Sequence, residues 1–129
     1  MQVNPAPLFK SEVLLFQLLT ANMNITTDQA LVKLLGFTNF LITRIRAVNS
    51  SGNLTTAAGG LYTGAAKSGN AVVAAAQTYA ALTGSTLGME LTLAAVGQAI
   101  QTVSPILSLT TGQGSAMTAD FYVLGVPLT

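Results

Sequence analysis

The chain contains no cysteine, histidine or tryptophan, and the first two absences each exclude a class of chemistry. Without cysteine there is no disulfide framework, and without cysteine or histidine only oxygen ligands remain for a metal ion. A serine nucleophile would lack a histidine base, and a Ser-Lys arrangement does not show in a sequence. We therefore expect a protein that is not an enzyme, with no cofactor, no metal and no catalytic residues.

Charge is also scarce. The 129 residues include five basic and four acidic side chains, 7% of the chain, whereas about a quarter of a typical soluble chain is charged. A net charge of +1 provides no basic patch, so we expect no nucleic-acid partner. Because half of the residues are hydrophobic, the chain either enters a membrane or has most of its surface covered by other proteins.

The membrane alternative is the weaker one. A spanning helix needs about 20 predominantly apolar residues. The apolar run at Val13–Phe16 is short and borders Glu12, and polar residues interrupt the uncharged stretch 68–89. Residues 1–5 lack the basic and apolar segments of a secretory signal. We therefore expect no membrane association and a surface that contacts other protein.

The hydrophobic pattern predicts an all-β fold. Short apolar or alternating segments are separated by clusters of Gly, Ser, Thr and Asn, which is typical of an antiparallel β-sandwich. About eight strands fit, enough for a jelly roll, in one domain over residues 11–129 after an extended arm at residues 1–10. The expected strands are 11–20, 38–48, 61–65, 87–95, 105–111 and 118–126, with 29–35 either a strand or a helical turn.

Three segments carry more specific expectations. In 38–48, Leu41, Thr43, Ile45 and Ala47 alternate with Ile42, Arg44 and Arg46, and in 105–111 Leu107 and Leu109 face inward while Ser108 and Thr110 face outward. Residues 70–82 mix helix-favouring alanines with strand-favouring residues, and we expect two short strands around a bend. The Gly112–Gly114 segment lacks the third glycine of a dinucleotide loop, so we expect a hairpin turn there.

Arg44 and Arg46 are the strongest binding candidates, because their spacing of two places both on one face of a strand. They could grip carboxylates of a partner through bidentate hydrogen bonds. Alternatively they form cross-strand ion pairs with Glu90 or Asp120. The four acids are far apart in sequence, and each is expected to be isolated and solvated rather than part of a catalytic pair.

A phosphate-binding loop around Lys67 is disfavoured, since Ala66 stands where such a loop has glycine. We expect a glycine-rich connection between strands with an exposed lysine. The N-terminal arm contains Pro5 and Pro7, and beside them Leu8 and Phe9 are the natural anchors for a partner.

Four segments resemble small virion proteins encoded beside the capsid genes of tailed bacteriophages, and together they cover most of the chain after residue 20. The ending, in which SLTT is followed by TADFYV, is the most specific piece. The segments are NITTDQALVKL (24–34), ITRIRAVNSSGNLTTAAGG (42–60), LYTGAAKSGNAVVAAAQTYAALT (61–83) and PILSLTTGQGSAMTADFYVLG (105–125).

The resemblance implies a cement or decoration protein on the outer face of an icosahedral head. Such a protein would bind the major capsid protein, act as a dimer or trimer and be located on the virion surface after assembly in the host cytoplasm. It carries no catalytic residues over to this chain. Two alternatives stay open: a tail or head-fibre adaptor, and a small carbohydrate-binding β-sandwich, which would need exposed tyrosines for sugar stacking.

Overall fold

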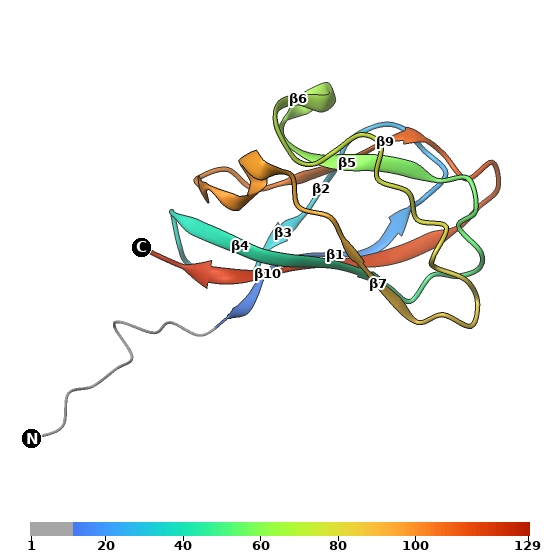
Figure 1. Ribbon diagram of the computed structural model, residues 1–129, viewed down its shortest axis with the longest axis horizontal. Coiled ribbons are helices and arrows are strands. Elements are labelled where there is room, and N and C mark those ends of the chain that lie inside the picture. The colour runs from blue at the N-terminus through green and yellow to red at the C-terminus, as the bar shows by residue number, and fades with distance from the viewer. Residues whose placement is uncertain (1–11) are drawn as a thin grey trace, which may run out of the picture.

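The computed structural model describes residues 12–129, which form ten strands in two antiparallel sheets (Figure 1). The arm at 1–10 and its anchors Leu8 and Phe9 lie outside the described residues. Two short 3₁₀ turns, Ala65–Lys67 and Ala95–Gln98, are the helical elements of the described part. No helix in residues 12–129 has the length and apolar character needed to cross a bilayer.

The larger sheet has six strands in the order β3-β1-β10-β4-β7, with β8 paired to the beginning of β4. Its two longest strands, β1 and β10, are neighbours along most of their length. The bounds are β1 (Val13–Asn22), β3 (Val32–Lys33), β4 (Phe40–Val48), β7 (Gly88–Leu91), β8 (Ile100–Gln101) and β10 (Thr118–Pro127).

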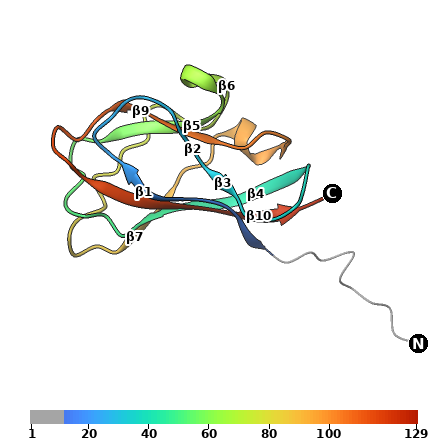
Figure 2. The same ribbon diagram turned by 180° about the vertical axis from the view of Figure 1, so that it is seen from behind.

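The smaller sheet has four strands in the order β2-β9-β5-β6. Figure 2, seen from behind, shows it stacked on the larger sheet, with the turn 65–67 and the beginning of β6 rising above it. The bounds are β2 (Gln29–Ala30), β5 (Ala58–Gly64), β6 (Ser68–Val73) and β9 (Ile106–Thr111).

The strand order is that of a jelly roll. When the short strands β3 and β8 are set aside, eight strands remain. Their pairing is nested: β1 pairs with β10, β2 with β9, β4 with β7 and β5 with β6. This nested pairing is a long antiparallel ribbon wound into two sheets, the double Greek key of the jelly roll. The prediction of an antiparallel, jelly-roll-like β-sandwich is therefore confirmed, with ten strands where about eight were expected.

The core lies between the sheets and contains most of the large apolar side chains. Phe16, Phe37 and Phe40 form an edge-to-face trio with ring centroids 5.0–5.5 Å apart. Tyr79 packs edge-to-face on Phe121 and donates a hydrogen bond from its hydroxyl to the Gly59 carbonyl. Alternating apolar residues on both inner faces are thus sufficient to fill the sandwich without disulfides.

The predicted alternation along 38–48 holds for only half of the strand. Ile45 and Ala47 face the core as expected, but Phe40 and Ile42 are the buried residues at the beginning of β4, while Leu41 is only half-buried. The pairing with β10 explains the difference, since Leu124 lies opposite Arg44 and Gly125 opposite Ile42. Thr43 is therefore an unpaired bulge residue, and the inward and outward positions exchange there.

The bulge also separates the outer face of β4 into two parts. Leu41 faces outward before it, and Arg44 and Arg46 face outward after it. Both arginines consequently share one face, as their spacing predicted.

Two other connections differ from expectation. Residues 70–82 contain no helix but only one strand, β6, because the chain turns at 74–77 and afterwards makes an isolated bridge from Thr78 to Ala58. Segment 29–35 becomes two strands, β2 and β3, one in each sheet, so it closes one side of the sandwich.

The Gly112–Gly114 segment is not a hairpin turn, because β9 and β10 belong to different sheets. It crosses the end of the sandwich and is fixed there by the chain that follows β1. Gln113 N donates to the Met23 carbonyl, and Gly114 N donates to Asn24 Oδ1. The predicted hairpin is therefore wrong, because sequence spacing does not show which sheet each strand joins.

Candidate interaction surface

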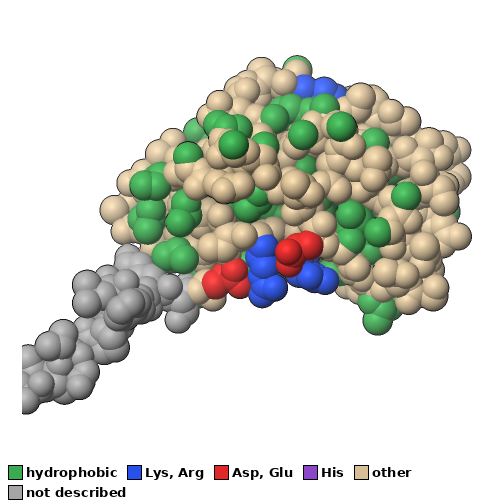
Figure 3. Space-filling model, viewed as in Figure 1, with side chains coloured by type: hydrophobic (Ala, Val, Ile, Leu, Met, Phe, Trp, Pro, Cys, Tyr) green, Lys and Arg blue, Asp and Glu red, His purple; other side chains and the backbone are tan. Residues whose placement is uncertain are grey.

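Arg44 and Arg46 lie on the outer face of the larger sheet and belong to a row of four alternating charges. The Nε and Nη2 atoms of Arg44 are both 3.0 Å from Oε1 of Glu12. Oε1 of Glu90 is 3.7 Å from Nη1 of Arg44 and 3.3 Å from Nη1 of Arg46. The sequence of contacts Glu12–Arg44–Glu90–Arg46, here called the charged row, is visible as red, blue, red and blue side chains in Figure 3.

Strand register explains the row. Glu90 on β7 lies directly opposite Arg46 on β4, so their side chains point to the same face. Glu12 precedes β1 and crosses toward β4, where the hydroxyl of the bulge residue Thr43 donates a hydrogen bond to it. This hydrogen bond and the Arg44 guanidinium lower the pKa of the Glu12 carboxyl against the opposing effect of desolvation.

The side chains of the charged row are partly exposed to solvent. The exposed fractions are 32% for Glu12, 44% for Arg44, 52% for Glu90 and 38% for Arg46. Exposed ion pairs contribute about 0–1 kcal/mol each to stability, since water and salt screen them. The row therefore adds little to folding, and its charges are available to a partner.

The cross-strand alternative for the two arginines is confirmed for Glu90 but not for Asp120. Asp120 instead accepts hydrogen bonds from the Thr20 backbone and the Asn49 side chain. The expectation that all four acids are isolated is wrong for Glu12 and Glu90, which share Arg44. Sequence reasoning missed Glu12 because the bulge that places Thr43 beside it left no signal in the residue pattern. The role of the arginines as anchors for a partner stays a prediction.

Apolar side chains border the charged row on the same face. Leu14 on β1 pairs with Leu124 on β10, which in turn pairs with Arg44 on β4, so the three side chains point to the same face. At the next outward-facing position, toward the beginning of β4, Leu41 pairs with Val126 on β10 and with Ile100 on β8, which gives a second apolar line across three strands. Ile100 is 62% exposed, so this end of the sheet presents an apolar surface beside charges.

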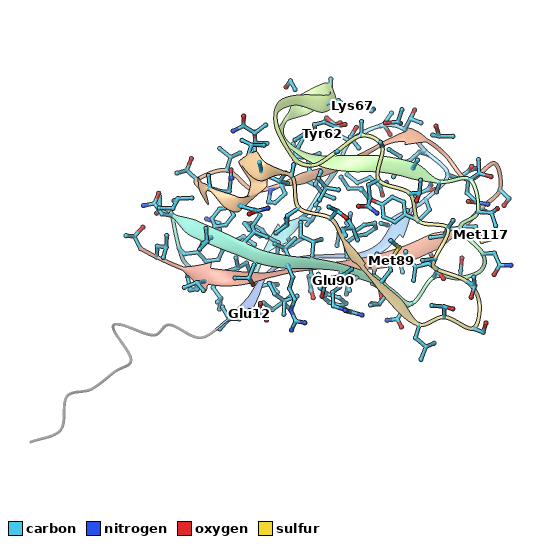
Figure 4. All side chains as sticks on the ribbon, viewed as in Figure 1. Glu12, Tyr62, Lys67, Met89, Glu90 and Met117 are labelled. Carbon is cyan, nitrogen blue, oxygen red and sulfur yellow. The ribbon has the colours of Figure 1, made fainter. Side chains whose placement is uncertain are left out.

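A second polar cluster lies on the opposite side of the sandwich, as the positions of Lys67 and Glu90 in Figure 4 show. Ser108 on β9 faces away from the core, as predicted, but it is fully buried under the segments that carry Asp28 and Lys67. Its hydroxyl donates to Asp28 Oδ1 at 2.9 Å and accepts from Lys67 Nζ at 3.0 Å. Lys67 Nζ also donates to the Thr26 carbonyl.

This Asp28–Ser108–Lys67 cluster fixes a strained turn. Ala66 and Lys67 both have positive φ, 55° and 63°, a conformation that non-glycine residues adopt at a cost of about 1 kcal/mol or more. Asp28 Oδ2 accepts a hydrogen bond from Ala66 N, and this bond, together with that from Ser108, lowers the pKa of Asp28. The expected exposed lysine is thus held at its ammonium end.

The cluster has the members of a Ser-Lys catalytic pair but not its arrangement. A base must accept the proton of the serine hydroxyl, whereas this hydroxyl donates to Asp28 and Lys67 donates to Ser108. Ser108 is also inaccessible to a substrate. The geometry is that of a structural clamp joining the segment before β2, the turn before β6 and strand β9.

Other site types find little support in residues 12–129. No three acidic side chains of this part come close enough to hold a metal ion. Of the three tyrosines, Tyr62 and Tyr79 are buried and Tyr122 is half-buried on the outer face of the larger sheet. The charged row and its apolar border are therefore the leading candidate site.

Comparison with known proteins gives no further assignment: no family model, no curated protein and no solved structure matches this chain.

Proposed function

We propose that the protein is a structural component of a tailed-bacteriophage virion, a cement or decoration protein. It binds the outer face of the head and stabilises contacts between major capsid subunits. The resemblance of the segment from 105 to 125 to small virion proteins suggests this role. The observation that carries it is physical: a jelly-roll sandwich with very few ionisable groups, four of which are already paired with one another.

Such a surface suits adhesion between proteins. Desolvating an unpaired charge at an interface is costly, and the cores of interfaces are depleted in charged residues. A neutral surface of Thr, Ser, Asn and Ala avoids most of that cost. On a lattice, several modest contacts made by one oligomer combine into strong overall binding.

The fold agrees with this proposal without deciding it. Jelly rolls occur in viral capsid proteins, but also in lectins and cupins, so the fold is compatible with several functions. The lectin alternative loses support from the burial of Tyr62 and Tyr79, since a sugar-stacking platform needs an exposed ring. A tail or head-fibre adaptor would use the same kind of surface at another place on the virion.

The test is to mix the purified protein with phage heads that lack it and to image the particles. Regular added density on the head surface, together with higher thermal stability of the heads, is expected. Density confined to the tail or neck would replace the head assignment by the adaptor alternative. Absence of any bound density at saturating protein would refute a virion role.

The arm prediction has its own comparison. Deleting residues 1–9, or changing Leu8 and Phe9 to serine, is expected to lower occupancy on the heads. Gln2→Ser is the matched control in the same arm and is expected to bind as the wild type does. Unchanged occupancy after the deletion would show that the arm is not an anchor.

A further inference from the structure

We propose that the outer face of the larger sheet is a dimer interface, on which a second copy of this chain docks about a twofold axis through the middle of the charged row. This goes beyond the proposed function, because it assigns a surface, a partner and a stoichiometry that hold whatever the protein binds on a virion.

The order of the charges carries the inference. The contacts run Glu12–Arg44–Glu90–Arg46, so the signs are negative, positive, negative, positive. A rotation of 180° about an axis that lies in the interface, perpendicular to the row and through its midpoint, reverses this order. Each charge of one copy then faces the opposite charge of the other: Glu12 faces the partner's Arg46, and Arg44 faces the partner's Glu90.

This self-complementarity is a property of the whole row. A closed twofold interface requires the same patch on both copies to match itself, and a row of four strictly alternating charges does so about its centre. A row of three would not, because its two ends carry the same sign. Complementary charges fix the orientation and exclude wrong partners more than they add affinity.

The surroundings of the row supply the apolar contact that an interface needs. Leu14 and Leu124 lie beside Arg44 at the middle of β4, and Leu41, Val126 and Ile100 cover the outer face at its beginning. The twofold rotation lays each end of β4 over the opposite end of the partner's β4, so the apolar end of each copy is brought toward the interface.

The experiment uses two charge-swapped variants of the full chain. The first, Glu12→Lys with Glu90→Lys, makes the row entirely positive, and the second, Arg44→Glu with Arg46→Glu, makes it entirely negative. Each is studied alone and as an equimolar mixture by analytical ultracentrifugation, beside the wild type. Circular dichroism establishes that each variant retains the β-sheet spectrum.

The expected result has three parts. The wild type sediments as a dimer of the 13.2 kDa chain, each variant alone has a dimer affinity lower by on the order of 100-fold, and the mixture forms a one-to-one heterodimer. A control with added positive charge away from the row, Ala76→Lys with Ser115→Lys, is expected to remain a homodimer and not to pair with the negative variant.

Several results would overturn the proposal. A wild type that is monomeric or trimeric throughout the measured concentrations would do so, as would a variant that dimerises alone like the wild type, or a mixture that stays monomeric. A monomeric wild type whose head binding is lost in both swapped variants would assign the row to a capsid partner instead. Failure of head binding with an intact dimer would count only against the proposed function.

Discussion

Replacing Ser108 with alanine removes one hydroxyl from the clamp between three segments of the smaller sheet. The hydroxyl donates to Asp28 and accepts from Lys67, and Ser108 itself is fully buried on β9. The substitution leaves a very small void and no strain, because alanine has the backbone and Cβ of serine. Any loss of stability therefore measures the two hydrogen bonds.

The magnitude follows from the partners. A hydrogen bond to a charged group contributes about 1.5–3 kcal/mol when its removal leaves that group unpaired in the interior. Asp28 and Lys67 are both exposed residues, so water replaces the lost partner and each bond contributes less than this range, about 1 kcal/mol. We expect a loss of about 2 kcal/mol in the free energy of unfolding, which for a domain of this size lowers Tm by about 8 °C.

The assay is urea and thermal unfolding followed by circular dichroism. Ser115→Ala is the matched control, since Ser115 is exposed and its side chain makes no hydrogen bond within the described residues, and its Tm should not change by more than about 2 °C. If Ser108→Ala has the same Tm as this control, the clamp does not stabilise the fold and the structural interpretation of the cluster is refuted. A gain or loss of a hydrolytic activity on substitution would refute it as well.

Three further predictions follow from other sites. The pKa of Asp28 is lowered in the folded protein, so the ionised carboxylate stabilises the fold fully above the ordinary pKa of 3.8, and this stabilisation is lost as the pH falls through the lower folded pKa. The difference in the free energy of unfolding between the wild type and Asp28→Asn, measured by urea unfolding, should therefore be largest above pH 4 and vanish in stronger acid. Gly60→Ala should cost about 3 kcal/mol or more, because its Cβ would lie 2.0 Å from the Val73 carbonyl oxygen, whereas Gly84→Ala, with nothing within 4 Å, should leave Tm unchanged or slightly raised; equal values for the two would contradict the packing argument. Tyr79→Phe removes a buried hydroxyl that donates to a backbone carbonyl and should cost about 1–2 kcal/mol in denaturant unfolding, and a neutral result would show that water satisfies the carbonyl.

The residue pattern was sufficient for the fold class because two of the core strands, β9 and β10, alternate apolar and polar residues. In β10, every second residue from Ala119 to Gly125 is buried, and β9 places Leu107 and Leu109 inward. Hydrophobic periodicity records such alternation directly. The jelly-roll order was predicted only as a type, since which strands pair is decided by contacts between distant residues.

The parts that could not be predicted share a physical cause. The bulge at Thr43 changes the parity of β4, the Gly112–Gly114 segment moves from one sheet to the other, and Ser108 is buried by chain distant in sequence. Each depends on a neighbour contributed by another part of the chain, and a local pattern contains no information about it. The candidate site was affected in the same way, because Arg44 and Arg46 were identified while Glu12 was not.

The few charges of this chain are arranged differently from those of an ordinary soluble domain. There, many scattered charges keep molecules apart; here, four of the nine lie in one row of net charge zero, and Asp28 and Lys67 lie together in the clamp. Pairing within the chain lowers the cost of covering these groups, because a paired charge loses less on desolvation than an isolated one. The grouping of charges into pairs and the scarcity of charge on the rest of the surface both favour association between proteins. The low number of ionisable side chains therefore supports a role that depends on protein contacts.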